Sequence, residues 1–192
     1  MRRVPGQTES ALSTLYLAFR KAPGDTAAQS ETAHRLVGEL LTAAGHGDAA
    51  WHKDENGRPT VEKSGLDVSI THTTGLVFCA LLVAEEARLG IDAEVLRPHP
   101  YASRLAARYF GPCEKALVAA DPAPRAFLTC FTKKEAFAKY RGDGLAHHLS
   151  GDDTAAPDFE AQNGVRFFCM EREGALLTLC LPAGCEPTLV EI

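Results

Sequence analysis

The apolar residues of the first half of the chain follow two different periods. Residues 12–20 alternate between apolar and polar, which predicts a strand, whereas apolar residues recur every three or four positions across residues 26–44, which predicts a helix. Gly45, a frequent helix terminator, follows that helix. Further strands are predicted over residues 66–71, 76–84 and 89–95. We expect the turn at residues 85–88 to join the last two as a hairpin.

The remainder of the chain is mainly helical and ends in two strands. Helices are predicted over residues 100–110, from Pro112 onwards, and over residues 124–141. The polar stretch 150–164 is expected to be a surface connection, and residues 165–171 and 175–181 are expected to be strands. This order of elements predicts an α+β fold made of two halves that meet near residue 88. The two halves share no sequence repeat.

Composition narrows the classes of protein that fit. Apolar residues make up 45% of the 192 residues and charged residues 23%, as in globular proteins with a substantial core. The longest apolar run, residues 76–84, is too short to cross a membrane, and the first residues lack the apolar region of a signal peptide, so we expect a cytoplasmic protein. A net charge of −5 argues against bulk binding of nucleic acid. The six cysteines form no CxxC pair, which favours buried free thiols over disulfides or a zinc site.

Asp92 and Glu94 are the first residues that could carry chemistry. They lie two apart on a predicted strand, so both side chains point to the same face. Two carboxylates on one face repel each other unless a cation or water separates them. On its own, however, the pair is better explained as solvated acids on a half-exposed strand.

Glu135 and Lys139 lie four apart on the predicted helix 124–141 and follow its apolar stripe. A surface pair with this spacing stabilises a helix by only about 0.2–0.5 kcal/mol, but a position beside apolar residues favours a site. With Asp92 and Glu94, Glu135 would supply oxygen donors of the kind that Mg²⁺ prefers, and the set contains no histidine or cysteine for zinc. A site of this kind serves phosphoryl-type transfer at a diphosphate.

Several short motifs occur in order along the chain. They are Asn56-Gly57-Arg58-Pro59, Val68-Ser69-Ile70-Thr71-His72-Thr73, Gly90-Ile91-Asp92-Ala93-Glu94, Arg108-Tyr109-Phe110 and Phe131-Thr132-Lys133-Lys134-Glu135-Ala136, the last continuing to Lys139 and Gly142-Asp143-Gly144-Leu145. In order and spacing, over roughly residues 30–182, the chain resembles the 4′-phosphopantetheinyl transferase superfamily, of the longer type that modifies carrier proteins of peptide and polyketide synthesis. Any one motif is weak evidence, but the ordered set is strong.

The resemblance implies a reaction and an architecture. The phosphopantetheine arm of coenzyme A would move to a serine of an apo acyl or peptidyl carrier protein, with release of 3′,5′-ADP. The architecture would be a single transferase domain over residues 1–192, made of two similar α+β halves at about residues 1–88 and 89–192. Each half would be a helix packed on a small antiparallel sheet, and the halves would be related by a pseudo-twofold axis. The metal motif lies mid-chain, unlike in the short trimeric relatives, so we expect a monomer.

The resemblance also implies roles for the acidic residues. Asp92, Glu94 and Glu135 would hold Mg²⁺ against the diphosphate, Glu94 either directly or through a water. Glu135, or a metal-bound water, would deprotonate the attacking serine. Lys139 would neutralise charge on the diphosphate. Asp92, Glu135 and Lys139 are therefore the expected catalytic residues.

Another set of residues matches family positions that contact coenzyme A. Arg58 and His72 would lie at the 3′-phosphate, and Thr71 would add a hydroxyl or backbone contact there. Arg35, in the first predicted helix, belongs to a segment that resembles the family's first-helix motif. Lys139 would contribute from the second half. Without its motif, His72 would be more simply explained as a histidine that closes a strand.

The chain departs from the family pattern at a few positions. Phe131 stands where tryptophan is usual, so packing is kept but an indole hydrogen bond is lost. The basic segment before the first helix is thin, with only Arg20 and Lys21 nearby. His147 and His148 match nothing in the pattern, and we expect solvated loop residues there.

Basic residues follow the metal motif, and we expect them to steer an acidic carrier protein. They are Arg97, Arg104, Arg108 and Lys115. The alternative is that these are scattered, solvated side chains.

Two alternatives also stand for the whole protein: a catalytically silent relative that binds coenzyme A or a carrier protein, and an unrelated α+β binding domain. The retention of all the expected metal and catalytic residues speaks against a silent relative.

Overall fold

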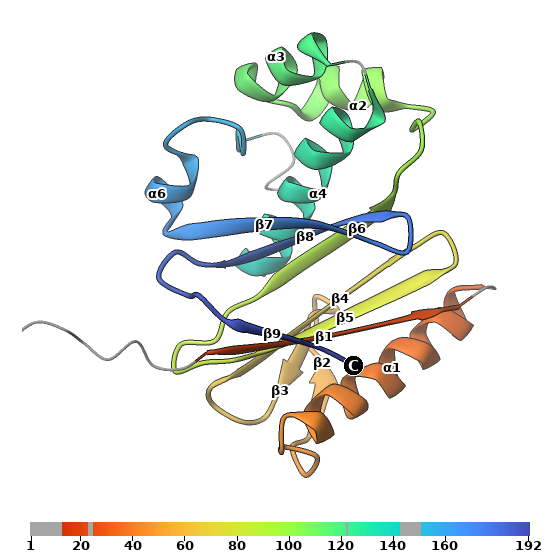
Figure 1. Ribbon diagram of the computed structural model, residues 1–192, viewed down its shortest axis with the longest axis vertical. Helices are drawn as coiled ribbons and strands as arrows, with labels where there is room; N and C mark the ends of the chain where they lie inside the picture. Colours follow the sequence, from red (N-terminus) through yellow and green to blue (C-terminus); the bar gives the residue numbers. More distant parts are fainter. Residues whose placement is uncertain (1–12, 23–24, 122, 143–150) are drawn as a thin grey trace, which may run out of the picture.

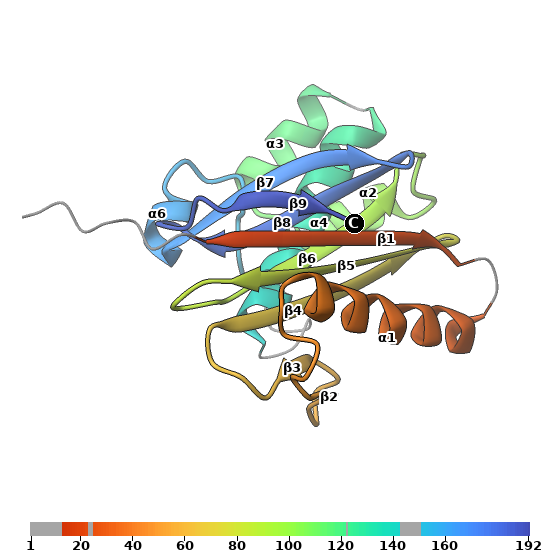
Figure 2. The same cartoon turned by 60° about the horizontal axis from the view of Figure 1, so that its bottom comes forward.

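The computed structural model describes residues 13–22, 25–121, 123–142 and 151–192, which form layers in the order helix, sheet, sheet and helix (Figures 1 and 2). The first sheet has the strand order β4-β5-β1-β9. Its strands are β1 (Thr14–Lys21), β4 (Leu66–Thr73), β5 (Leu76–Val83) and β9 (Thr188–Glu191). Helix α1 (Thr26–Ala43) covers the outer face, because its stripe of Leu36, Val37 and Leu40 packs on that sheet.

The second sheet has the strand order β6-β8-β7 and is covered by the long helix α4. The elements are β6 (Gly90–Val95), β7 (Val165–Arg172), β8 (Ala175–Pro182) and α4 (Pro124–Arg141). Helices α2 (Ala102–Tyr109) and α3 (Pro112–Ala120) follow β6, and α2 packs on the first half of α4. The short helix α6 (Phe159–Asn163) precedes β7. The main core lies between the two sheets, where Phe78 and Leu82 meet Ile91 and Leu179.

Both halves have the same chain topology. Each runs strand, helix, strand, strand, and in each the third of these strands lies in the middle of the sheet, antiparallel to both neighbours. The predicted α+β class and the pairing of one helix with one small antiparallel sheet are confirmed. The pseudo-twofold relation and the boundaries near residue 88 stay predictions. Strand β9, from the end of the chain, joins the first sheet beside β1 and so links the halves.

The predicted hairpin between residues 76–84 and 89–95 is wrong. Strand β5 pairs with β1 on one edge and with β4 on the other, so it has no free edge for β6. The turn at residues 85–88 instead carries the chain from the first sheet to the second. Four short elements were not predicted from the sequence: strands β2 (Trp51–Lys53) and β3 (Pro59–Val61), helix α6 and strand β9. All are too short to show a periodic pattern.

Polar side chains from β4 join the two sheets along β6. The carboxylate of Asp67 accepts a hydrogen bond from the backbone N–H of Leu89 at 2.7 Å, and the hydroxyl of Ser69 accepts one from Ile91 at 3.1 Å. Thr73 accepts another from the N–H of Val95 at 3.3 Å. On this edge of β6, hydrogen bonds to side chains of β4 thus replace the backbone hydrogen bonds that a neighbouring strand would form. The site described below lies along this junction.

Two predictions from composition can be compared with the structure. All six cysteines are free thiols, and Cys79, Cys130 and Cys180 are buried, whereas Cys169 is exposed. In the described part of the chain, no helix is both long enough and apolar enough to cross a bilayer.

Candidate active site

Side chains from β6 and α4 meet around an acidic hollow of about 310 Å³. Asp92 and Glu94 point to one face of β6, as their two-residue spacing requires. Glu135 and Lys139 lie one turn apart on α4 and point into the same hollow. The structure therefore brings together all the residues that were expected to bind metal and diphosphate, and we call these four residues the acidic site.

Gly90 allows β6 and α4 to approach closely enough for this meeting. A Cβ atom at Gly90 would lie 2.0 Å from the carbonyl oxygen of Ala136 and 2.5 Å from the backbone nitrogen of Tyr140. Both atoms belong to the helix backbone and cannot move aside like a flexible side chain. Any larger residue at position 90 would push α4 away from the strand.

The two carboxylate oxygens of Asp92 have different surroundings. Oδ1 accepts hydrogen bonds from the hydroxyl of Thr71 at 2.9 Å and from Nζ of Lys139 at 2.8 Å. Oδ2 is buried and has no hydrogen-bond partner. A buried polar atom of this kind is costly unless something else bonds to it, so Oδ2 is the atom that indicates a ligand here.

Glu94 and Glu135 both favour the protonated form more than ordinary glutamates do. Burial and then the nearby Asp92 carboxylate raise the pKa of Glu135 to about 7, against the opposing effect of Lys139. Burial and then Asp92 also raise the pKa of Glu94, although a hydrogen bond from Thr73 at 3.1 Å lowers it. Like charges are therefore crowded into a partly desolvated space.

This donor set fits a divalent cation. The carboxylates outnumber the ammonium group by two, and one buried oxygen is unpartnered. Within the described ranges, however, no group of three or more His, Cys, Asp or Glu side chains is arranged to hold a metal ion by itself. An ion at the acidic site would therefore take only part of its coordination from protein, which is how Mg²⁺ binds when water and substrate phosphates complete its octahedron.

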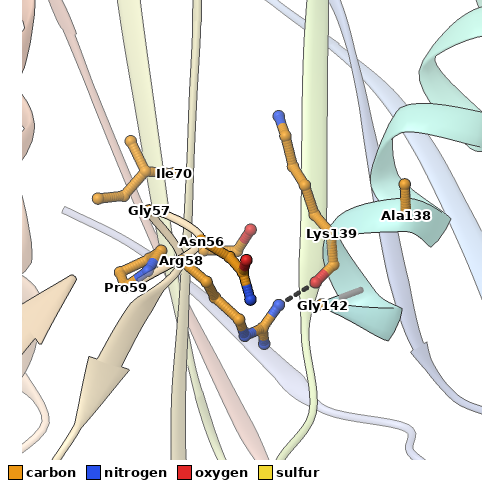
Figure 3. A pocket seen from close by; sticks show the side chains of 9 residues that line it. Asn56, Gly57, Arg58, Pro59, Ile70, Ala138, Lys139 and Gly142 are labelled. Carbon is orange, nitrogen blue, oxygen red and sulfur yellow. Dashed lines mark hydrogen bonds between the residues drawn. The ribbon is translucent and has the colours of Figure 1, made fainter. Parts of the chain in front are cut away.

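A second hollow of about 260 Å³ adjoins the first, and Ile70 and Lys139 line both (Figure 3). Its other walls are the 56–59 turn, Ser69 and the end of α4. A third hollow, of about 240 Å³, lies between α1 and the short strand β2 and also reaches Ile70. The acidic site thus opens onto a run of hollows across the junction between the halves.

Arg58 lines the second hollow but is already engaged with protein. Its guanidinium donates to Oδ2 of Asp67 at 2.6 Å, to the carbonyl of Leu89 at 3.2 Å and to the carbonyl of Lys139 (Figure 3). Burial lowers the pKa of Arg58 and raises that of Asp67, and the attraction between the two groups opposes both shifts. Arg58 therefore ties the two halves together at the edge of the hollow.

The other residues expected at coenzyme A fall into different places. Thr71 is buried and bonded to Asp92, so its hydroxyl orients a carboxylate. His72 is exposed at the wall of the acidic hollow. Arg35 is exposed on α1, and its neighbour His34 is the residue that lines the third hollow. A contact between Arg35 and coenzyme A stays a prediction. His147 and His148 lie outside the described residues.

Some residues that support the site from β4 had no role in the sequence-based prediction. Asp67 was not singled out, and Ser69 and Thr73 were noted only as members of a motif, although all three share one face of the strand with Thr71. This two-residue spacing is a recognisable signal of one polar face. What it could not show is that the face meets β6 from another sheet.

The part of the chain that holds the acidic site matches a known family. Residues 88–179 match the model of the 4′-phosphopantetheinyl transferase superfamily. HetI, a 4′-phosphopantetheinyl transferase of Nostoc sp. (strain PCC 7120), is 33% identical over 107 residues, which cover 52% of this chain and 44% of that relative. The match therefore spans less than half of the relative's length. It agrees with the resemblance carried by the motifs.

Proposed function

Because residues 88–179 match the model of the 4′-phosphopantetheinyl transferase superfamily, we propose that the chain transfers the 4′-phosphopantetheine group from coenzyme A to a serine of an apo acyl or peptidyl carrier protein, releasing 3′,5′-ADP. The observation that carries the proposal is the acidic site. Its carboxylates and lysine come from two elements and converge on one hollow, and Oδ2 of Asp92 is left unpartnered.

In this proposal the acidic site binds Mg²⁺ and the diphosphate of coenzyme A. Asp92, Glu94 and Glu135 would hold the ion, which when bound offsets the negative charge that develops on the diphosphate. Lys139 adds a positive charge from α4 on the same side. The Glu135 carboxylate, whose pKa lies near 7, is suited to accept the proton of the attacking serine.

We place the nucleotide part of coenzyme A in the hollows that run from the acidic site toward α1. His72 is free at the wall and can meet a phosphate, whereas Arg58 contributes positive charge while bonded to Asp67. Thr71 acts through Asp92 in this proposal and does not need to touch coenzyme A.

We place the carrier protein on α2, where exposed arginines lie beside aromatic rings. The guanidinium of Arg104 lies 4.9 Å from the ring centre of Tyr101, and that of Arg108 lies 5.1 Å from the ring centre of Tyr109. Such a surface suits an acidic helix. Reversing Arg104 and Arg108 to Glu should raise the KM for the carrier and flatten its salt dependence. An unchanged KM and salt dependence would remove α2 from the docking surface.

The decisive experiment is to incubate the protein with an apo carrier, coenzyme A and Mg²⁺ and to measure the intact mass of the carrier. We expect the mass of one phosphopantetheine group to be added, and a strongly slowed addition when Asp92→Asn replaces the wild type. No addition on any of several carriers would defeat the proposal. Coenzyme A binding that is independent of Mg²⁺ and leads to no transfer would indicate the silent relative. A monomer and a cytoplasmic location remain part of the proposal.

A further inference from the structure

The last turn of α4 is held by side chains from outside the helix. The N–H of Gly142 donates to the carbonyl of Ala138 at 2.9 Å. Arg58 donates to the carbonyl of Lys139 (Figure 3). Arg88 donates through Nε to the carbonyl of Tyr140 at 2.6 Å and through its terminal nitrogen to that of Arg141 at 2.5 Å. The Gly142 N–H and the two arginines together thus bond each of the carbonyls of residues 138–141.

The two arginines come from the other half of the molecule and suit this end of the helix. Positive charge at a helix C-terminus is favourable because the free carbonyls carry partial negative charge. Gly142 has φ of 78°, the left-handed conformation of a helix cap, and a Cβ there would lie 3.0 Å from the guanidinium of Arg88. Arg88 itself is exposed and lies in the segment that crosses from β5 to β6.

This cap lies directly beside a residue of the acidic site. Lys139 belongs to the last turn, and its Nζ lies 2.8 Å from Oδ1 of Asp92. Glu135 lies one turn earlier, away from the helix end, whereas the contact with Gly90 reaches the backbone of both Ala136 and Tyr140. Loosening the last turn should therefore move Lys139 more than it moves Glu135.

We propose that Arg88 is a positioning residue for Lys139. Its planar guanidinium bridges two successive carbonyls, keeps the last turn of α4 wound and so keeps Nζ of Lys139 on Asp92. Arg88 touches none of the acidic side chains in this arrangement and acts only through the helix. The catalytic consequence rests on the proposed function, whereas the structural consequence does not.

The test compares Arg88→Ala and Arg88→Lys with the wild type, with Arg166→Ala as control because Arg166 is an exposed arginine on β7 paired with Glu186. We expect Arg88→Ala to speed hydrogen exchange at the amides of residues 140–142 by at least on the order of fivefold, the effect of losing one of its two hydrogen bonds. The side-chain NMR resonance of Lys139 should also move. A lysine at position 88 cannot bridge both carbonyls, so Arg88→Lys should resemble the alanine variant.

The activity measurement separates positioning from general stability. In the wild-type background Arg88→Ala should lower kcat by on the order of fivefold and leave the KM for the carrier unchanged. In a Lys139→Ala background it should lower kcat no further, because both changes act through the same group. The proposal would be overturned if the two substitutions lowered kcat multiplicatively or if the Lys139 resonance did not move. Full restoration of wild-type behaviour by Arg88→Lys would also overturn it. An inactive wild type that still showed the exchange and resonance changes would defeat only the transferase function.

Discussion

Two lysines on α4 meet carboxylates in very different surroundings. Lys134 is fully buried and its Nζ lies 3.0 Å from Oε2 of Glu114, which is also fully buried. Lys134 donates to the carbonyl of Asp152 as well, and Glu114 accepts from the N–H of Gly111 at 2.8 Å and from the hydroxyl of Thr154 at 2.6 Å. We call Glu114 and Lys134 the buried pair. One positive and one negative group are matched there.

The acidic site is not matched in this way. Lys139 faces three carboxylates, its side chain keeps 26% of its exposure, and one oxygen of Asp92 has no partner. Balanced charge with complete hydrogen bonding is what a structural ion pair needs to offset desolvation. Excess negative charge with an unpartnered oxygen is destabilising unless a cation arrives. The balance of charge therefore distinguishes the buried pair from the candidate active site on the same helix.

The largest expected effect comes from removing the charge of Asp92 while keeping the shape of the acidic site. Asp92→Asn retains an oxygen that can accept from Thr71 but removes the charge, so transferase activity should fall about 100- to 1,000-fold. The unfolding midpoint should stay the same or rise because repulsion with Glu94 and Glu135 is relieved. Steady-state kinetics and urea unfolding measure the two quantities, with the exposed Glu186→Gln as control. Full activity in Asp92→Asn would show that the charge surplus has no function.

The next effect should fall on stability and concerns the buried pair. Lys134→Met leaves the charge of Glu114 buried and unpaired, so the free energy of unfolding should drop by about 3–5 kcal/mol. Replacing both partners, as Lys134→Met with Glu114→Leu, should recover much of that loss. Urea unfolding of the single and double variants checks this. A single variant as stable as the wild type would contradict the structural role assigned to the pair.

The third expected effect is on the pH dependence of Mg²⁺ affinity, which should change by about tenfold per pH unit. The Glu135 carboxyl has a pKa of about 7 without metal and must lose its proton to become a ligand. The apparent affinity for Mg²⁺ should therefore be constant above that pH and fall by about tenfold per unit below it. This affinity is measured by titrating the protein with Mg²⁺ and coenzyme A between about pH 5.5 and 8.5, a range that brackets the roughly neutral pKa of Glu135. An affinity that did not change with pH would remove Glu135 from the ligands.

The smallest expected effect concerns the support that β4 gives to Glu94. Thr73→Val keeps the shape of the side chain but removes the hydroxyl that bonds Glu94 and the N–H of Val95. The loss of about 1 kcal/mol should weaken apparent Mg²⁺ affinity by a few-fold and leave the KM for the carrier unchanged. Thr73→Ser, which keeps the hydroxyl, is the matched control. Equal Mg²⁺ affinity in both variants would mean that Thr73 does not orient Glu94.

The sequence by itself determined the α+β class, most helices and long strands, and the identity of the acidic residues. Periodicity revealed the elements because one face of each must be apolar. The two-residue spacing of Asp92 and Glu94 and the four-residue spacing of Glu135 and Lys139 fixed which side chains share a face. The motifs then indicated the 4′-phosphopantetheinyl transferase superfamily, and the match of residues 88–179 to the model of that superfamily agrees with this.

Only the tertiary structure decided how these elements meet. The strand after residue 88 joined a second sheet because both edges of β5 were already occupied. Arg58 was bonded to Asp67 in place of being free for a phosphate, and Arg88 capped a helix more than 50 positions away. Local spacing carries no information about contacts between distant segments, which form by packing and charge pairing across the folded chain. For the same reason, the pairing of Lys134 with the buried Glu114 became visible only in the folded chain, although its neighbour Glu135 was already expected at the acidic site from the motifs.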